Sequence, residues 1–174
     1  ELAIDYGIPL AYEGGIEIFK TNPAIILLAW LRILDYEDSK RGWSVILEEA
    51  GYKLDTVKYI LDNNDYPKNI LKFREKLKED DDISTIARKV FDRYGINNAF
   101  ADKIIEVLDN TFQNSYMNIA DLIQFIEENI ESREIYEVDT SLEENMVRVQ
   151  TIHSAKGLEY PIVFISDVNY GTFP

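Results

Sequence analysis

Between Thr21 and Asn145, apolar residues recur at intervals of three and four positions in seven separate stretches. This spacing places apolar side chains on one face of an α-helix. Polar residues or proline open the stretches and glycine closes some of them, which is typical of short helices joined by short loops. The pattern therefore predicts a mainly α fold with a cluster of about seven helices.

The predicted helix starts follow from capping residues. In chain order they are Thr21 with Asn22 and Pro23, Asp38 or Ser39, Asp55, Pro67, Asp82 or Ser84, Asn97 or Asn98, and Asn118. The first helix is apolar on nearly all faces from Ala24 to Leu34. We expect it to form the centre of the cluster, with Trp30 and Leu31 among the most buried residues.

Several polar features of the helical stretch have two interpretations. A basic side of the fourth helix consists of Lys68, Lys72, Arg74, Lys76 and Lys78. It is either a solvated face or a set of phosphate contacts. Tyr52, Tyr59, Tyr66 and Tyr94 either edge the core or stack on bases. The stretch from Asp121 to Asn145 has nine acidic residues and one basic residue, and its end is interpreted as a solvated connector.

Strand-like segments flank the helices and predict a small α/β part. Residues 147–151 alternate like a strand with one buried face. The apolar run Ile162 to Ile165 is typical of a strand covered on both faces in a parallel sheet. We expect 146–168 to form two strands in one sheet with residues before Gly14. The chain thus divides into 1–20, 21–145 and 146–174, as a helical insertion in an α/β domain would produce.

Composition excludes several classes of site. The net charge of −14 over 174 residues argues against a free-standing nucleic-acid binder. The absence of cysteine excludes disulfides and thiolate zinc sites, and a single histidine, His153, excludes a multi-histidine metal site. The apolar run Ala24 to Leu31 is shorter than the ~20 residues that span a bilayer. Because the chain begins with Glu1 and shows no signal peptide, we expect a piece of a longer cytoplasmic protein.

The segment from Thr151 to Glu159 combines two hydroxyls, the imidazole, an ammonium, a glycine and a carboxylate. It follows a predicted strand, where ligands bind in open α/β sheets. Lys156 beside Gly157 offers a cation and close backbone approach to a phosphate. Glu159 can accept a hydrogen bond from a ribose hydroxyl. A polar loop with incidental charges is the alternative.

Residues 151–165, TIHSAKGLEYPIVFI, closely resemble motif V of the UvrD/Rep/PcrA-type superfamily 1 DNA helicases. The end of the chain, 171–174, resembles the segment that follows this motif. Gly7-Ile8-Pro9 with Gly14-Gly15 and Phe19 resembles the stretch after motif IV, which leads into an inserted helical subdomain. The resemblance implies that the two ends of the chain belong to an incomplete RecA-like sheet of the second motor domain.

The resemblance also implies roles for residues. Thr151 and His153 would face single-stranded DNA and couple it to the ATP cleft. Lys156 and Gly157 would lie near the nucleotide phosphates, and Glu159 would bind the ribose. Such enzymes generally step 3′ to 5′ along one strand.

A second DNA contact is implied within the insertion. The family's turn of the type Gly-Ile-Gly, which contacts the duplex backbone, corresponds to Gly51–Thr56. Lys53 replaces its second glycine, so Lys53 would add a phosphate contact in place of close backbone approach. Lys68 and Lys72 are the further candidates for DNA binding.

The chain has no G-x-x-x-x-G-K-[ST] loop and no acidic metal motif after a strand. We therefore expect no complete catalytic set, no metal ligand and no bound cofactor in this piece, and no activity from it alone. ATP and Mg²⁺ would serve the full-length enzyme, whose partners would be single-stranded and duplex DNA and its remaining motor domains. The alternatives are a helical protein-interaction module without a motor and a helicase fused to a nuclease.

Overall fold

The structure is a computed structural model that describes residues 10–12, 15–80, 82–112, 118–138 and 147–166. The chain divides into two compact units. Gly15–Thr140 forms the helical unit, and Glu1–Gly14 together with Ser141–Pro174 forms the strand unit. The expected features at Gly7-Ile8-Pro9, Gly14, Met146, Val168 and 171–174 lie outside the described residues.

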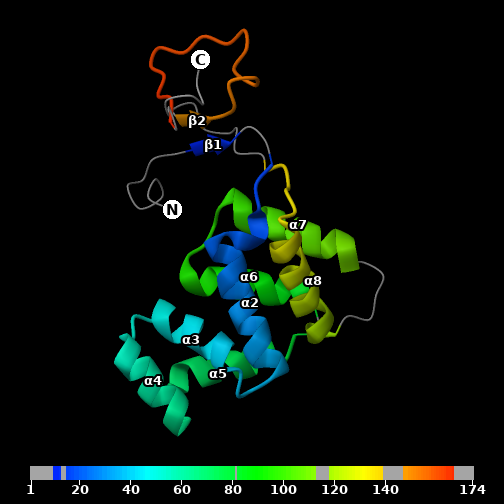
Figure 1. Ribbon diagram of the computed structural model, residues 1–174. Helices are drawn as coiled ribbons and strands as arrows, with labels where there is room; N and C mark the ends of the chain where they lie inside the picture. Colours follow the sequence, from blue (N-terminus) through cyan, green and yellow to red (C-terminus); the bar gives the residue numbers. More distant parts are fainter. Residues whose placement is uncertain (1–9, 13–14, 81, 113–117, 139–146, 167–174) are drawn as a thin grey trace. The chain divides into compact units, whose positions relative to one another are not determined.

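The described residues of the helical unit contain a short 3-10 helix and seven α-helices (Figure 1). They are η1 (Ile18–Lys20), α2 (Asn22–Asp35), α3 (Lys40–Glu49), α4 (Leu54–Asn63), α5 (Lys68–Leu77), α6 (Ile83–Tyr94), α7 (Ala99–Phe112) and α8 (Ile119–Ser132). The prediction of a mainly helical chain with about seven helices is confirmed.

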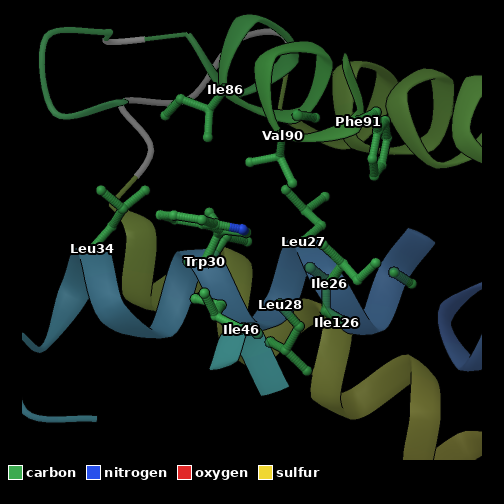
Figure 2. Close-up of a cluster of buried hydrophobic side chains, with 14 of the residues drawn as sticks. Ile26, Leu27, Leu28, Trp30, Leu34, Ile46, Ile86, Val90, Phe91 and Ile126 are labelled. Carbon is green, nitrogen blue, oxygen red and sulfur yellow. The ribbon is translucent and has the colours of Figure 1, made fainter. Parts of the chain in front are cut away.

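Helix α2 is the centre of the helical unit, as its apolar sequence predicted. Figure 2 shows it between α6 on one side and α3 and α8 on the other, with Val90, Ile46 and Ile126 directed at it from those helices. Trp30 and Leu31 have 0% exposure, which confirms the expectation for both. The indole Nε1 of Trp30 donates a hydrogen bond to the Tyr94 hydroxyl at 3.1 Å, so this polar atom is satisfied inside the core.

Local capping chemistry explains most helix starts. The side chains of Ser39, Asp82 and Asn118 accept hydrogen bonds from the first-turn amides of α3, α6 and α8, which confirms these predicted caps. The predicted start at Asp55 is wrong, because α4 begins at Leu54 with Lys53 as its N-cap. Asp55 lies instead in the first turn, where a carboxylate favours the positive end of the helix dipole.

Arg74 does not belong to a solvated basic face, contrary to one of the two sequence interpretations. Its side chain is 3% exposed, and Nε donates to the carbonyl oxygen of Ile33 at 2.7 Å. Ile33 lies in the last turn of α2, where carbonyl groups have no partner within the helix. The guanidinium also pairs with Glu75 at 3.1 Å and Glu37 at 3.5 Å. Arg74 therefore caps α2 from α5.

The two chain segments that enter and leave the helical unit are joined by backbone hydrogen bonds. Ile16 and Tyr136 donate to each other's carbonyl oxygens at 2.9 Å, forming an antiparallel bridge. The Phe19 ring packs edge-on against Tyr136 and Phe125, with centroids 5.7 Å apart in each pair. Val138 is buried. In the described part of the acidic segment, Tyr136 and Val138 therefore pack on the core, whereas Glu131, Glu134 and Glu137 are exposed. The rest of the predicted connector, 139–145, lies outside the described residues.

The described part of the strand unit contains one parallel pair, β1 (Leu10–Tyr12) and β2 (Val147–Val149). Leu10 lies opposite Val147 and Tyr12 opposite Val149, which confirms that residues before Gly14 pair with the strand after the helices. Val147 and Val149 are both exposed, so the predicted buried face of β2 is wrong.

The predicted strand at Ile162–Ile165 is also wrong. These residues form no strand, and the Phe164 side chain is 90% exposed. A strand covered on both faces needs neighbouring strands and helices on each face. The described strand unit supplies a single pair of strands, so the apolar run has nothing to pack against there.

Candidate functional site

The segment Thr151–Glu159, the 151–159 loop, directly follows Gln150 at the end of β2 and forms a closed turn. The Thr151 hydroxyl oxygen accepts from the Ser154 amide at 3.2 Å and lies 2.9 Å from the Ser154 hydroxyl. The Ala155 amide donates to the Thr151 carbonyl at 3.0 Å. Thr151 thus holds the start of the loop through both its side chain and its backbone.

The second half of the loop carries the residues expected to meet a nucleotide. Gly157 has a φ of +86°, a conformation that favours glycine, and a Cβ built there would meet no atom within 4 Å. The Leu158 amide donates to the Ala155 carbonyl at 3.0 Å, which closes this turn. Lys156 and Glu159 are exposed on either side of Gly157. The loop therefore brings the predicted nucleotide contacts together on an accessible turn.

His153 lies in the same turn and is exposed. Its carbonyl oxygen accepts from the Lys156 amide at 3.3 Å. The hydrogen-bonded segment from Thr151 to Leu158 thus contains both residues predicted to contact single-stranded DNA, Thr151 and His153. It also contains Lys156 and Gly157, and Glu159 follows it directly.

The predicted duplex contacts lie in the helical unit. Lys53 is the N-cap of α4 and is exposed, and the preceding Gly51 has a φ of +84°. Lys68 and Lys72 are exposed on α5, four positions apart and so on one helix face. The exposed Lys76 extends this row by one turn, whereas Lys78 pairs with Glu75 at 3.0 Å.

The four tyrosines considered for base stacking have different surroundings. Tyr66 stacks on Trp43, with ring centroids 4.0 Å apart, and Tyr94 accepts the Trp30 hydrogen bond. Tyr52 is half-buried against the core. Tyr59 on α4 is 61% exposed. The core-edge interpretation therefore holds for three of the four.

Gln150 and Tyr160 are two residues of this site that the sequence interpretation did not single out. The side-chain Nε2 of Gln150 donates to the Tyr160 hydroxyl at 3.0 Å. The two residues lie immediately before and after the 151–159 loop. Their position beside the loop is the feature of the sequence from which they could have been predicted.

In the described part of the chain, no helix is long and apolar enough to cross a membrane. Within the same residues, no group of three or more histidine, cysteine or acidic side chains is arranged to hold a metal ion.

Residues 33–174 match the family described as the UvrD-like helicase C-terminal domain. This match covers most of the chain, including the 151–159 loop. The chain belongs to the UvrD-like helicase C-terminal domain family. The resemblance inferred from motif V is therefore confirmed.

Curated proteins with similar sequences to this UvrD-like domain include a RecBCD enzyme subunit, an ATP-dependent helicase/nuclease subunit and a probable DNA helicase. The RecBCD enzyme subunit RecB of Chlamydia trachomatis is 24% identical over 93% of the chain and 17% of its own length. An ATP-dependent helicase/nuclease subunit of Pediococcus pentosaceus is 22% identical over 95% of the chain and 17% of its own length.

A probable DNA helicase II homolog of Mycoplasma capricolum is 34% identical over 68% of the chain and 14% of its own length. The UvrD-like chain thus spans about a sixth, or less, of the length of these three curated relatives.

Proposed function

We propose that this chain is part of an ATP-dependent DNA helicase of the UvrD/Rep type, which couples ATP hydrolysis to movement on single-stranded DNA and to duplex unwinding. The observation that carries the proposal is the family match, because it runs through the helices and through the 151–159 loop. The strand unit would be part of the second RecA-like motor domain. The parallel pairing of β1 with β2 supports an insertion, because the chain leaves one strand and returns to its neighbour.

The 151–159 loop would couple the two ligands of the motor. Glu159 would accept a hydrogen bond from the ribose of ATP, and Lys156 beside Gly157 would approach the phosphates. Thr151 and His153 would contact single-stranded DNA. Because hydrogen bonds link Thr151 to Ala155 and Ala155 to Leu158, a shift at the nucleotide end would be passed to the DNA end. Closure of two motor domains around ATP would then move the DNA contacts along the strand, generally 3′ to 5′.

Phosphoryl transfer also requires a phosphate-binding loop, a Mg²⁺ carboxylate and an arginine. The sequence of this chain contains no G-x-x-x-x-G-K-[ST] loop. ATP and Mg²⁺ would therefore act in a longer cytoplasmic protein that contains this chain, and we assign no Mg²⁺ ligand here. The chain by itself should neither hydrolyse ATP nor unwind DNA.

His153→Ala tests the motor assignment in a protein that carries this chain together with a phosphate-binding loop. DNA-stimulated ATP turnover should fall about tenfold or more, equivalent to about 1.4 kcal/mol of lost stabilisation. The melting temperature should stay unchanged, because the His153 side chain is exposed and contributes little to a core. A variant that melts earlier but turns over normally when folded would show that His153 is structural.

The duplex contact is tested by charge reversal in the chain itself. Lys53→Glu, Lys68→Glu and Lys72→Glu should each weaken binding to duplex DNA. Each should also make the salt dependence less steep. The negative slope of the logarithm of the association constant against the logarithm of the salt concentration should shrink by about 0.9 for every phosphate that is no longer neutralised. Lys103→Glu on α7 is the matched control, since Lys103 pairs with Glu106 at 2.8 Å and has no proposed DNA contact. An equal effect of the control would show that net charge alone governs binding.

A helicase fused to a nuclease is a second candidate. The relatives that match over 93% and 95% of this chain are named as RecB of the RecBCD enzyme and as part of an ATP-dependent helicase/nuclease. A nuclease domain encoded downstream in the same reading frame would establish this candidate. A reading frame without an upstream phosphate-binding loop would instead favour a helical interaction module that has no motor activity.

A further inference from the structure

The two ends of the 151–159 loop are joined by a side-chain hydrogen bond. Gln150 follows β2 directly, and its Nε2 donates to the Tyr160 hydroxyl at 3.0 Å. Both residues are half-buried, whereas the loop between them is exposed apart from Ala155. The bond therefore lies at the sheltered base of an otherwise solvent-facing loop.

We propose that Gln150 and Tyr160 are positioning residues, a clasp that closes the 151–159 loop and holds Glu159 and Lys156 in place. The bonds inside the loop link Thr151 to Ala155 and Ala155 to Leu158. They order the turn from its β2 end. The clasp adds a tie at the opposite end, at the residue next to Glu159.

Closing a loop at both ends reduces the number of conformations that its residues can adopt. Without the clasp, the segment after Leu158 would pivot about the last internal bond, and Glu159 would move with it. The position of Glu159 relative to a bound ribose thus depends on Tyr160. This functional consequence rests on the proposed role of Glu159 in nucleotide binding.

The Gln150 amide provides a specific way to test the pair. Its Oε1 is shielded from solvent and accepts no hydrogen bond from a described residue. Tyr160→Phe removes the partner of Nε2 and so leaves both polar atoms of the Gln150 amide without a hydrogen bond from a described residue. A sheltered polar group with no partner is the costly case. The double variant Gln150→Leu with Tyr160→Phe replaces both groups by apolar ones, which is close to neutral. The double variant should therefore be closer to wild type in stability than Tyr160→Phe alone, although neither variant keeps the Gln150–Tyr160 hydrogen bond.

The clasp itself is tested in the chain without nucleotide, by NMR measurement of amide solvent exchange. In Tyr160→Phe, the amides of Ala155, Lys156 and Leu158 should exchange about two- to tenfold faster, the range that loss of one hydrogen bond gives. The double variant also lacks the Gln150–Tyr160 hydrogen bond, so its loop amides should exchange faster to a similar extent, although its stability should be closer to wild type. Unchanged exchange in Tyr160→Phe, or wild-type exchange in the double variant, would overturn the clasp.

The control for this measurement is Tyr36→Phe, which removes a hydroxyl from a ring at the end of α2 that is 61% exposed. It should leave loop exchange unchanged. If it accelerates exchange as much as Tyr160→Phe does, the effect is not specific to the clasp and the proposal fails.

The proposed effect of the clasp on nucleotide binding is tested by steady-state ATP hydrolysis in the longer protein. Tyr160→Phe should raise the KM for ATP about two- to tenfold and leave kcat within about twofold, because a positioning residue acts on binding. The double variant should raise KM to a similar extent, because it also lacks the Gln150–Tyr160 hydrogen bond. If Glu159→Gln leaves KM unchanged, the proposed nucleotide role fails whatever the clasp does. If Glu159→Gln raises KM but Tyr160→Phe does not, the positioning role fails and the nucleotide site stands.

Discussion

Arg74 carries its charge into the interior of the helical unit, and its main contact is a backbone carbonyl. Arg74→Met should lower the free energy of unfolding by about 1–3 kcal/mol, because the sheltered Ile33 carbonyl loses its donor. The cost should stay below that of a broken buried ion pair, since Glu37 and Glu75 are 64% and 61% exposed and remain solvated. Urea unfolding measures the change. Lys76→Met on the same helix is the control and should fall within about 0.5 kcal/mol of wild type.

Tyr94 makes the stability of the helical unit sensitive to alkaline pH. Burial raises the pKa of its phenol above the ordinary value of 10.0, although the hydrogen bond from Trp30 opposes this shift. A raised folded pKa means that the stabilisation is complete below about pH 10 and is lost as pH rises through the folded pKa. Tyr94→Phe should be less stable than wild type at neutral pH, and this gap should narrow above about pH 10. Urea titrations followed by tryptophan fluorescence measure the difference in unfolding free energy between the two proteins at each pH. A difference that widens above about pH 10 would contradict a raised pKa of Tyr94.

At the scale of elements, the end of α8 is strained. Its C-cap, Arg133, has a φ of 56° and a ψ of 45°, in the left-handed region that costs an ordinary L-residue about 1–2 kcal/mol. Arg133→Gly should therefore stabilise the chain by about 0.5–1 kcal/mol after the extra backbone entropy of glycine is included. Thermal unfolding measures the gain.

Helix α4 provides the matched comparison, because its C-cap, Asn64, has a φ of 53°. Asparagine tolerates this region better than arginine does. Asn64→Gly should consequently stabilise the chain less than Arg133→Gly does. Equal gains at the two sites would show that backbone strain at Arg133 is not the cause.

At the scale of the whole molecule, the helical unit has its own hydrophobic core, and its first and last segments are joined to each other by backbone hydrogen bonds. The Ile16–Tyr136 bridge ties its two chain ends, and a Cβ on Gly15 would overlap the Ile135 side chain. We predict that residues 15–140 fold without the remainder of the chain. Far-UV circular dichroism should give one cooperative transition, with a midpoint close to that of the helical signal in the whole chain. A non-cooperative transition would show that the strand unit is needed.

The helical character, most helix starts and the candidate loop could be predicted from the amino-acid sequence alone. These features are local: capping residues act within one turn, helical periodicity acts within one element, and the residues of the 151–159 loop are consecutive. Ser39, Asp82 and Asn118 could be predicted as caps because each bonds an amide only two or three positions away. The family resemblance followed from the same contiguous segment.

Which segments contact one another depends on tertiary packing and could not be predicted from local sequence patterns. Arg74 matched the lysine pattern of its helix, yet it caps a carbonyl 41 positions earlier in the chain. The acidic segment looked solvated, yet Tyr136 pairs with Ile16 at the opposite end of the unit's sequence. Ile162–Ile165 has the composition of a buried strand, but burial requires neighbours on both faces, and the described strand unit provides a single pair of strands. In each case the outcome depends on a partner distant in sequence, which no local pattern specifies.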